Sequence, residues 1–226
     1  MSIDYSAGLP EELMALRVAN ELVDGSYVNL GIGIPTMVSN WIEGRDITLE
    51  AEIGILEQGP FALPDEVDQD LISAGAEPVT VLPGASFFSI GESFAMIRGG
   101  HIDVAVLGAL QVSEHGDLAG WNNPARKMTH CGNIGGSMDL AVGAKKVIVV
   151  MKHTTREGEP RILKECTYLL TAKGMVNLIV TNLAVIEVTG EGLVLKEVAS
   201  GFTPEQVQAV TEAHLTVAPD LKEMEL

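Results

Sequence analysis

The chain of 226 residues has few cysteines, few cations and no long hydrophobic run. Its two cysteines, Cys131 and Cys166, lack the spacing of a metal site, so we expect reduced thiols rather than disulfides or a metal centre. The longest apolar runs, such as residues 147–151, have the length of a strand, whereas a membrane-spanning helix needs about 20 residues. Residues 1–5 lack the basic and apolar regions of a signal peptide, and we therefore expect a cytoplasmic protein without a membrane segment.

The scarcity of cations narrows the range of partners. Fourteen Lys and Arg residues stand against 31 Asp and Glu residues, which gives a formal net charge of −17. This charge repels nucleic acid and anionic lipid at long range, so we expect neither as a partner. A polyanionic ligand would have to be bound by a local group of cations or by backbone amides.

The pattern of apolar segments predicts one α/β domain that spans residues 1–226. Runs typical of buried strands alternate with short segments of helical periodicity, as expected for a largely parallel sheet covered on both faces. A β-rich region follows, and the last helix begins at Pro204 with Thr203 as its N-cap. We place strands at 27–30, 47–51, 78–82, 102–107, 147–151, 176–181, 183–188, 193–198 and 215–218, and further helices at 11–23, 36–42 and 89–97.

Two glycine-rich turns are candidates for ligand binding. The first, Gly31-Ile32-Gly33-Ile34-Pro35, follows a predicted strand and precedes a helix, an arrangement whose backbone can bind an anion. The same pattern also fits a plain βα turn in which glycines allow tight packing. The third glycine of the dinucleotide-binding fingerprint is missing, so we expect no nicotinamide cofactor. The second turn contains Gly135 and Gly136 and leads toward another short helix.

Glu52 is the candidate catalytic residue, because it lies where the apolar strand 47–51 meets a glycine turn. The sheet holds the carboxylate on one side, while Gly54 lets a substrate come close to the backbone on the other. Most glutamates in such positions are solvated loop residues, and Glu57 is a rival carboxylate just past the turn. The position alone therefore leaves both interpretations open.

Taken together, these stretches resemble the B subunit of a family I coenzyme A transferase of the 3-oxoacid type. The resemblance covers nearly the whole chain, and several long matches in the same order are more specific than any single glycine motif. The matching segments are 31–35, 52–56, 82–88, 93–103, 107–112, 135–140 and 144–147.

The resemblance implies an open three-layer α/β/α sandwich with a mostly parallel sheet, a fold shared with ribose-5-phosphate isomerases. It also implies a separate A subunit, an active site near the A/B interface and an α2β2 or similar heteromer, because the A subunit's own glycine-rich motif has no counterpart here. The implied substrates are an acyl-CoA, such as succinyl-CoA or acetyl-CoA, and a 3-oxoacid or another short-chain carboxylic acid. No tightly bound cofactor is expected, since the CoA thioester enters as a substrate.

The resemblance also assigns roles to individual residues. The family signature Ser-Glu-Asn-Gly corresponds to residues 51–54, which implies that Glu52 is the nucleophile; the polar neighbours that would help orient it are here Ala51 and Ile53. Gly136 is the implied oxyanion-hole donor. The segment 122–134 looks a few residues longer than in common 3-oxoacid enzymes, which could reshape the pocket wall. CoA or substrate is expected to bind at Gly31, Gly33, Gly54, Gly135 and Gly136, with Arg126, Lys127 and Lys146 as candidates for its phosphates.

A carboxylate nucleophile suits CoA transfer because a covalent intermediate keeps the energy of the thioester. Glutamate, with a reference pKa of ~4.3, is ionised at neutral pH and needs no histidine as a base. Its weak nucleophilicity must be offset by positioning, worth roughly 7–11 kcal/mol, and backbone amides must stabilise the oxyanion. The alternatives are an acyl-CoA hydrolase of the same fold and a non-catalytic binding subunit, and a sugar-phosphate isomerase is the rival at the level of the fold.

Overall fold

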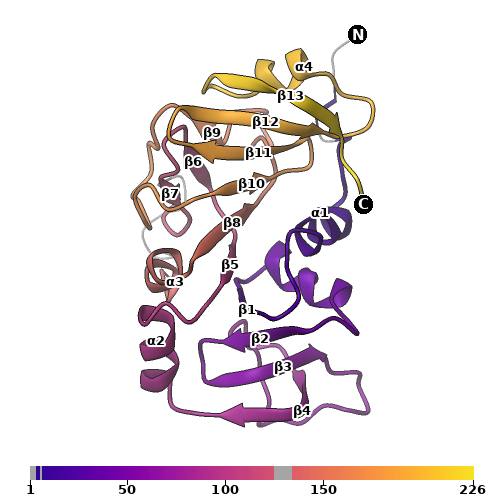
Figure 1. Ribbon diagram of the computed structural model, residues 1–226, viewed down its shortest axis with the longest axis vertical. Helices are drawn as coiled ribbons and strands as arrows, with labels where there is room; N and C mark the ends of the chain where they lie inside the picture. The colour runs from indigo at the N-terminus through magenta and orange to yellow at the C-terminus, as the bar shows by residue number, and fades with distance from the viewer. Residues whose placement is uncertain (1–3, 6, 125–133) are drawn as a thin grey trace.

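The computed structural model describes residues 4, 5, 7–124 and 134–226, and in them a ten-stranded sheet runs the length of the molecule (Figure 1). A smaller sheet of β7 (Leu118–Ala119), β6 (Gln111–Ser113) and β9 (Ile162–Leu163) packs beside it. From one edge to the other, the strands of the large sheet are β13 (Leu215–Glu223), β12 (Gly192–Val198), β11 (Ala184–Thr189), β10 (Leu178–Val180), β8 (Lys146–Val150), β5 (Val104–Leu107), β1 (Ser26–Leu30), β2 (Ile47–Ala51), β3 (Ile55–Phe61) and β4 (Val79–Phe87).

The centre of the large sheet is parallel, which confirms the predicted α/β fold. Strands β10, β8, β5, β1 and β2 pair in parallel, each with its neighbour. The pairs β2–β3 and β3–β4 on one side, and β10–β11 and β11–β12 on the other, are antiparallel, while the outermost β13 is again parallel to β12. The carboxyl ends of the central strands therefore meet at one edge of the sheet.

Each face of the sheet has its own hydrophobic core, so the molecule has three layers. In β5, Val104 and Val106 face one core, whereas Ala105 and Leu107 face the other. Strands that are buried on both faces consist of continuous apolar residues, which is why these strands could be predicted from the sequence. The first face is covered by α1 (Glu11–Ala19) and the 3₁₀ helix η1 (Ile34–Trp41), and the second by α2 (Ile90–Arg98), α3 (Ser137–Gly143), α4 (Pro204–Ala209) and the small sheet (Figure 1).

One helix begins at the capping residue that was predicted for it, whereas two others differ from the predicted helices in their bounds or type. Thr203 caps α4 as predicted, accepting a hydrogen bond from the amide of Gln206 at 3.4 Å. The helix predicted at 11–23 ends at Ala19, because the following residues close tighter turns with i to i−3 hydrogen bonds. The helix predicted at 36–42 is a 3₁₀ helix that starts earlier, where Thr36 bonds to the carbonyl of Gly33 through its amide and its hydroxyl. Within the described residues, no helix has the length and apolar character needed to cross a bilayer.

Strand β3 was not predicted, and its sequence explains why. It contains Gln58-Gly59-Pro60, and glycine and proline both disfavour a strand interior. The structure accommodates them in irregular pairing with β4, whose register shifts between Leu56 and Gln58 and again between Gln58 and Phe61. Strands β4 and β13 are likewise longer than the predicted segments 78–82 and 215–218.

A buried ion pair joins α1 to the sheet at β12. The Arg17 guanidinium donates from Nε to Glu197 Oε2 at 2.7 Å and from Nη2 to Glu197 Oε1 at 2.8 Å. Arg17 is 7% exposed and Glu197 is 4% exposed. Glu21 accepts a further bond from Arg17 at 2.9 Å but is itself less buried. The bidentate pair thus holds the first helix against a strand far away in the sequence.

We expect the substitution Glu197→Gln to lower the free energy of unfolding by about 3 kcal/mol, because it leaves the buried Arg17 charge with Glu21 as its remaining carboxylate partner. Glu21→Gln is the matched control and should cost about 1 kcal/mol or less, since Glu21 is partly solvated. Urea unfolding followed by circular dichroism measures both. Equal losses for the two variants would contradict the assigned role of the pair.

Candidate active site

Glu52 lies directly after β2, at the start of the tight turn into β3. The turn is closed by a hydrogen bond from the Gly54 amide to the Ala51 carbonyl at 2.9 Å. Gly54 has a φ of +115°, and a Cβ at this position would overlap the carbonyl oxygen of Phe88. Only glycine fits here without strain, so the turn that presents Glu52 depends on Gly54.

Glu52 borders a cavity of about 390 Å³ at the carboxyl ends of the central strands. Gly31 follows β1 and Gly108 follows β5, and both line this cavity together with Gly135 and Gly136. The volume falls within the range of small-molecule sites, and the location is the one where open α/β sheets bind ligands. The structure therefore brings the predicted nucleophile and three of the predicted binding glycines to one cavity.

Gly136 lies beside the Glu52 side chain at the N-terminus of α3. A Cβ on Gly136 would lie 3.6 Å from Glu52 Cγ and only 2.7 Å from Phe94 Cζ. The first distance shows that the two residues are neighbours, and the second shows that the space between α2 and α3 admits glycine alone unless Phe94 moves. The main chain at Gly136 can thus approach the carboxylate without obstruction by a side chain.

A network of three buried polar residues, Asn29, Glu50 and Ser93, reaches Glu52 through Asn29. The two N–H groups of Asn29 Nδ2 are shared among three acceptors, namely Glu50 Oε2 at 2.8 Å, the Glu50 carbonyl at 3.0 Å and Glu52 Oε2 at 3.3 Å. Ser93 Oγ donates to Glu50 Oε1 at 2.5 Å. Asn29 and Ser93 are fully buried and Glu50 is 3% exposed. The network connects α2, β2 and β1 to the candidate nucleophile.

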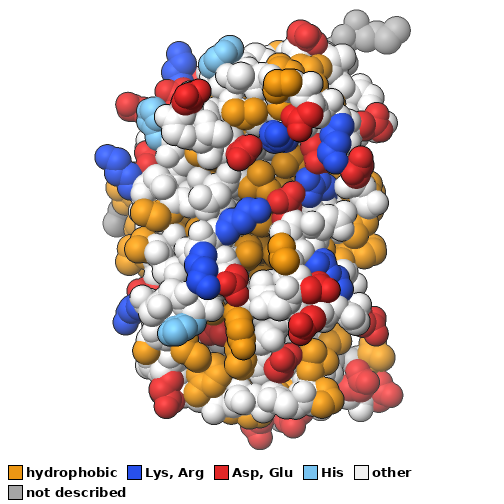
Figure 2. Space-filling model, in the orientation of Figure 1, with side chains coloured by type: hydrophobic (Ala, Val, Ile, Leu, Met, Phe, Trp, Pro, Cys, Tyr) orange, Lys and Arg blue, Asp and Glu red, His pale blue; other side chains and the backbone are white. Residues whose placement is uncertain are grey.

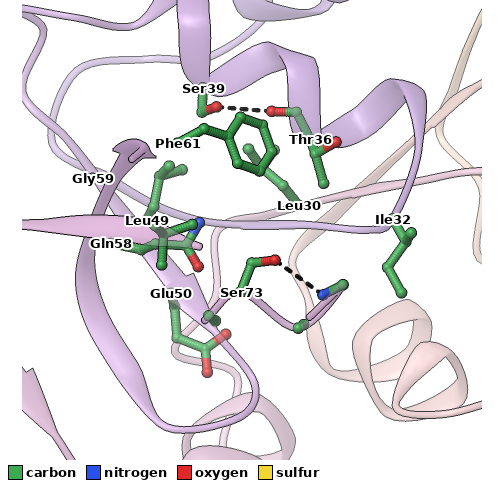
Figure 3. A pocket seen from close by; sticks show the side chains of 14 residues that line it. Leu30, Ile32, Thr36, Ser39, Leu49, Glu50, Gln58, Gly59, Phe61 and Ser73 are labelled. Carbon is green, nitrogen blue, oxygen red and sulfur yellow. Dashed lines mark hydrogen bonds between the residues drawn. The ribbon is translucent and has the colours of Figure 1, made fainter. Parts of the chain in front are cut away.

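The environment of Glu50 favours its neutral form. Burial raises the pKa of Glu50 above its ordinary value, and the nearby charge of Glu52 adds to this effect, whereas the hydrogen bonds from Ser93 and Asn29 oppose it. On its other side Glu50 borders a small pocket of about 20 Å³, which Ser73, Gln58 and Leu49 also line (Figure 3). Such a volume holds about one water molecule, and Glu50 itself is buried.

Other predicted site residues, Gly54 among them, do not line this cavity. Gly33 adopts a φ of +95° at the start of η1, with open space around it, and does not line the cavity. Glu57, the rival carboxylate, lies on β3, where it accepts a hydrogen bond from Thr48 Oγ1 at 3.1 Å. Glu57 does not line the cavity either, so the geometry favours Glu52 over it.

Lys146 is the predicted phosphate-binding cation that falls among the described residues, and it does not line the cavity. Lys146 begins β8 and therefore lies at the opposite edge of the parallel sheet, where it pairs with Glu21 at 3.0 Å. Arg126 and Lys127 lie outside the described residues. On the face seen in Figure 2, Lys and Arg side chains lie among Asp and Glu side chains rather than forming a basic patch.

Sequence reasoning missed Asn29, Glu50 and Ser93. A signal was present, since Asn29 and Glu50 are polar residues inside otherwise apolar strands. Their contact depends on the register of β1 and β2, which places Asn29 opposite Glu50 and which the sequence does not display.

Comparison with known proteins places these features in a family. Residues 11–210 match the family described as coenzyme A transferase. The B subunit of the succinyl-CoA:3-ketoacid coenzyme A transferase of Helicobacter pylori is 48% identical over 206 residues, which cover 91% of this chain and 98% of the relative. The B subunit of the 3-oxoadipate CoA-transferase of Pseudomonas putida is 48% identical over 198 residues, covering 88% and 92%. These matches span nearly the full length of both relatives.

A solved structure agrees with the fold. The acyl-CoA transferase of Escherichia coli O157:H7 superposes with a TM-score of 0.75 at 20% identity and covers 100% of this chain and 44% of its own. At this identity the likeness supports the fold alone.

We expect Gly54→Ala to lower the free energy of unfolding by at least about 2 kcal/mol. The backbone at this position has a positive φ that alanine disfavours, and the new Cβ would clash with the Phe88 carbonyl. The control is Gly190→Ala in the β11–β12 turn, where a Cβ meets nothing within 4 Å, and we expect a change below about 0.5 kcal/mol. Urea unfolding of the two variants tests the expectation. A Gly54→Ala protein as stable as the control would show that the turn tolerates a side chain.

Proposed function

The chain belongs to the coenzyme A transferase family, and on that premise we propose that it is the B subunit of a 3-oxoacid CoA-transferase. With its A subunit it would move CoA from an acyl-CoA such as succinyl-CoA to a 3-oxoacid or a related short-chain acid. Glu52 is the proposed nucleophile. The observation that carries this assignment is the position of the Glu52 carboxylate at the 390 Å³ cavity, next to Gly136 and with a hydrogen bond from Asn29.

The proposed reaction proceeds through two covalent states of Glu52. A carboxylate oxygen attacks the acyl-CoA carbonyl, the carbon–sulfur bond breaks, and a mixed anhydride and CoA thiolate result. The thiolate then attacks the glutamyl carbonyl, which releases the first acid as a carboxylate and leaves a glutamyl-CoA thioester. The acceptor acid repeats these steps in reverse, so no bond energy is lost to hydrolysis.

The geometry supports this chemistry in two ways. Glu52 follows a central strand and a turn fixed by Gly54, so the nucleophile is held with little freedom, as positional catalysis requires. Gly136 lines the same cavity as Glu52 and is its neighbour, which supports its proposed role as an oxyanion-hole donor.

We expect Glu52→Gln and Glu52→Asp to abolish transfer in the A/B complex, because the first lacks a nucleophile and the second falls short of the carbonyl. Incubation of the wild-type complex with succinyl-CoA and then borohydride or hydroxylamine should modify the peptide that contains Glu52. Glu57→Gln is the control and should retain both activity and labelling, since Glu57 lies outside the cavity. A fully active complex with unmodified Glu52 would falsify the assignment.

An acyl-CoA hydrolase is the second candidate, because Ala51 and Ile53 offer no polar side chain to the carboxylate. Release of free CoA, measured with and without acetoacetate as acceptor, separates the two activities. A transferase needs the acceptor, whereas a hydrolase does not. Normal turnover by the Glu52→Gln complex would instead favour a non-catalytic supporting subunit.

We expect Gly136→Ala to lower kcat by about 10²- to 10³-fold, the usual effect of losing an oxyanion-hole donor. The new Cβ must displace Phe94 or move the main chain away from Glu52. Gly91→Ala on α2 is a suitable control, because its Cβ would meet only Ser89 Oγ at 3.7 Å. Steady-state kinetics of both complexes provide the comparison, and equal activity would remove Gly136 from the proposed mechanism.

A further inference from the structure

The carboxylate of Glu52 has no polar side chain next to it in the sequence. Its neighbours Ala51 and Ile53 are apolar, so an orienting hydrogen bond must come from another element. The structure provides it from the adjacent parallel strand, where Asn29 Nδ2 lies 3.3 Å from Glu52 Oε2. We propose that Asn29 orients the nucleophile and that Glu50, held by Ser93, is a positioning residue that acts through Asn29.

A hydrogen bond from Asn29 makes the two carboxylate oxygens of Glu52 unequal. Oε2 is bound to the amide, which restricts rotation of the carboxylate about its last side-chain bond and fixes the direction in which Oε1 points. Fixing the attacking group in this way lowers the entropy that must be lost on reaching the transition state. Loss of this hydrogen bond should therefore lower the rate of attack and leave the binding of substrate unchanged.

Glu50 holds the amide of Asn29 in place. The Nδ2 group is bound to both the side-chain oxygen and the main-chain carbonyl of Glu50, at 2.8 and 3.0 Å. Glu50 is in turn fixed from α2 by Ser93, whose hydroxyl lies 2.5 Å from Oε1. All three residues are buried, so water does not compete for these bonds and each one constrains the next.

The charges around this network are few. Ser93 and Asn29 are neutral, and Glu52 is the charged group that acts on Glu50. Glu50 and Glu52 share the Asn29 amide, and the charge of Glu52 adds to the effect of burial in raising the pKa of Glu50. Replacement of the Asn29 amide by a third carboxyl group should therefore lower kcat more than removal of the amide does.

This inference rests on the proposed function of Glu52, and the experiment compares Asn29→Ala with Asn29→Asp in the A/B complex. We expect Asn29→Ala to lower kcat by about 10- to 100-fold, the usual effect of losing a hydrogen bond to an ionised group, with the KM for succinyl-CoA within about twofold. Asn29→Asp has the same shape but replaces the donor with a carboxylate. Its kcat should be lower than that of Asn29→Ala at about pH 8 and should rise toward about pH 6, as the new carboxyl gains a proton.

A purely structural role would lower thermal stability and kcat together in Asn29→Ala, whereas an orienting role lowers its kcat out of proportion to any loss of stability. Thr48→Ala is the matched control: Thr48 bonds to Glu57 from the same strand β2 but away from the cavity, and its kcat should equal the wild type. Thermal unfolding of every complex is measured alongside the kinetics. Ser93→Ala, which removes one hydroxyl at the far end of the network, should lower kcat about three- to tenfold without changing KM.

Covalent labelling of Glu52 in the presence of succinyl-CoA distinguishes a failure of the proposed function from a failure of the role proposed for Asn29. A wild-type complex that is never labelled on Glu52 would overturn the proposed function itself. A labelled wild type, together with Asn29 variants whose kcat stays within about twofold or in which Asp is milder than Ala, would overturn the role of Asn29. If the Asn29 variants fail to fold, an unchanged kcat in Ser93→Ala overturns the network, and a lowered kcat at unchanged KM supports it.

Discussion

The parallel register between β1 and β2 is the constraint on which the site depends. It sets Asn29 opposite Glu50 and ends both strands at the same edge of the sheet, so that Gly31 and Glu52 border one cavity. Side chains alternate between faces along a strand, so a slip of one residue would turn Glu50 away from Asn29 and Ser93. The cores on both sides of the sheet resist such a slip, because it would take Leu49 out of its hydrophobic core and put a polar side chain in its place.

The distribution of charge bears on how an anionic substrate could bind. Glu52 is the charged residue among the described residues that line the cavity, and the rest are glycines, apolar side chains and hydroxyls. With a net charge of −17, this chain offers little long-range attraction to a phosphate-bearing ligand. Under the proposed function, cations for the CoA phosphates would therefore come from the A subunit or from the segment that contains Arg126 and Lys127.

The parts of the structure that sequence predicted are those governed by local chemistry. Apolar runs located the central strands, Thr203 marked the start of α4, and the junction of strand and glycine located Glu52. Other parts depend on partners far along the chain. Strand β3 forms despite Gly59 and Pro60 because neighbouring strands hold it, and the bonds between Asn29, Glu50 and Ser93 join residues 21 and 43 positions apart. The local sequence pattern gives no information on such contacts, because strand register and helix packing determine them.

The apolar neighbours of Glu52 make its orientation a property of the sheet rather than of the local sequence. A polar flanking residue would belong to the same turn as Glu52, whereas Asn29 belongs to another strand, β1. The turn is therefore free to be shaped by packing, as Gly54 against Phe88 shows, without loss of the orienting bond. Under the proposed function, the same pairing that stabilises the centre of the fold would also set the direction of attack, so changes that loosen β1 from β2 should reduce catalysis before they unfold the protein.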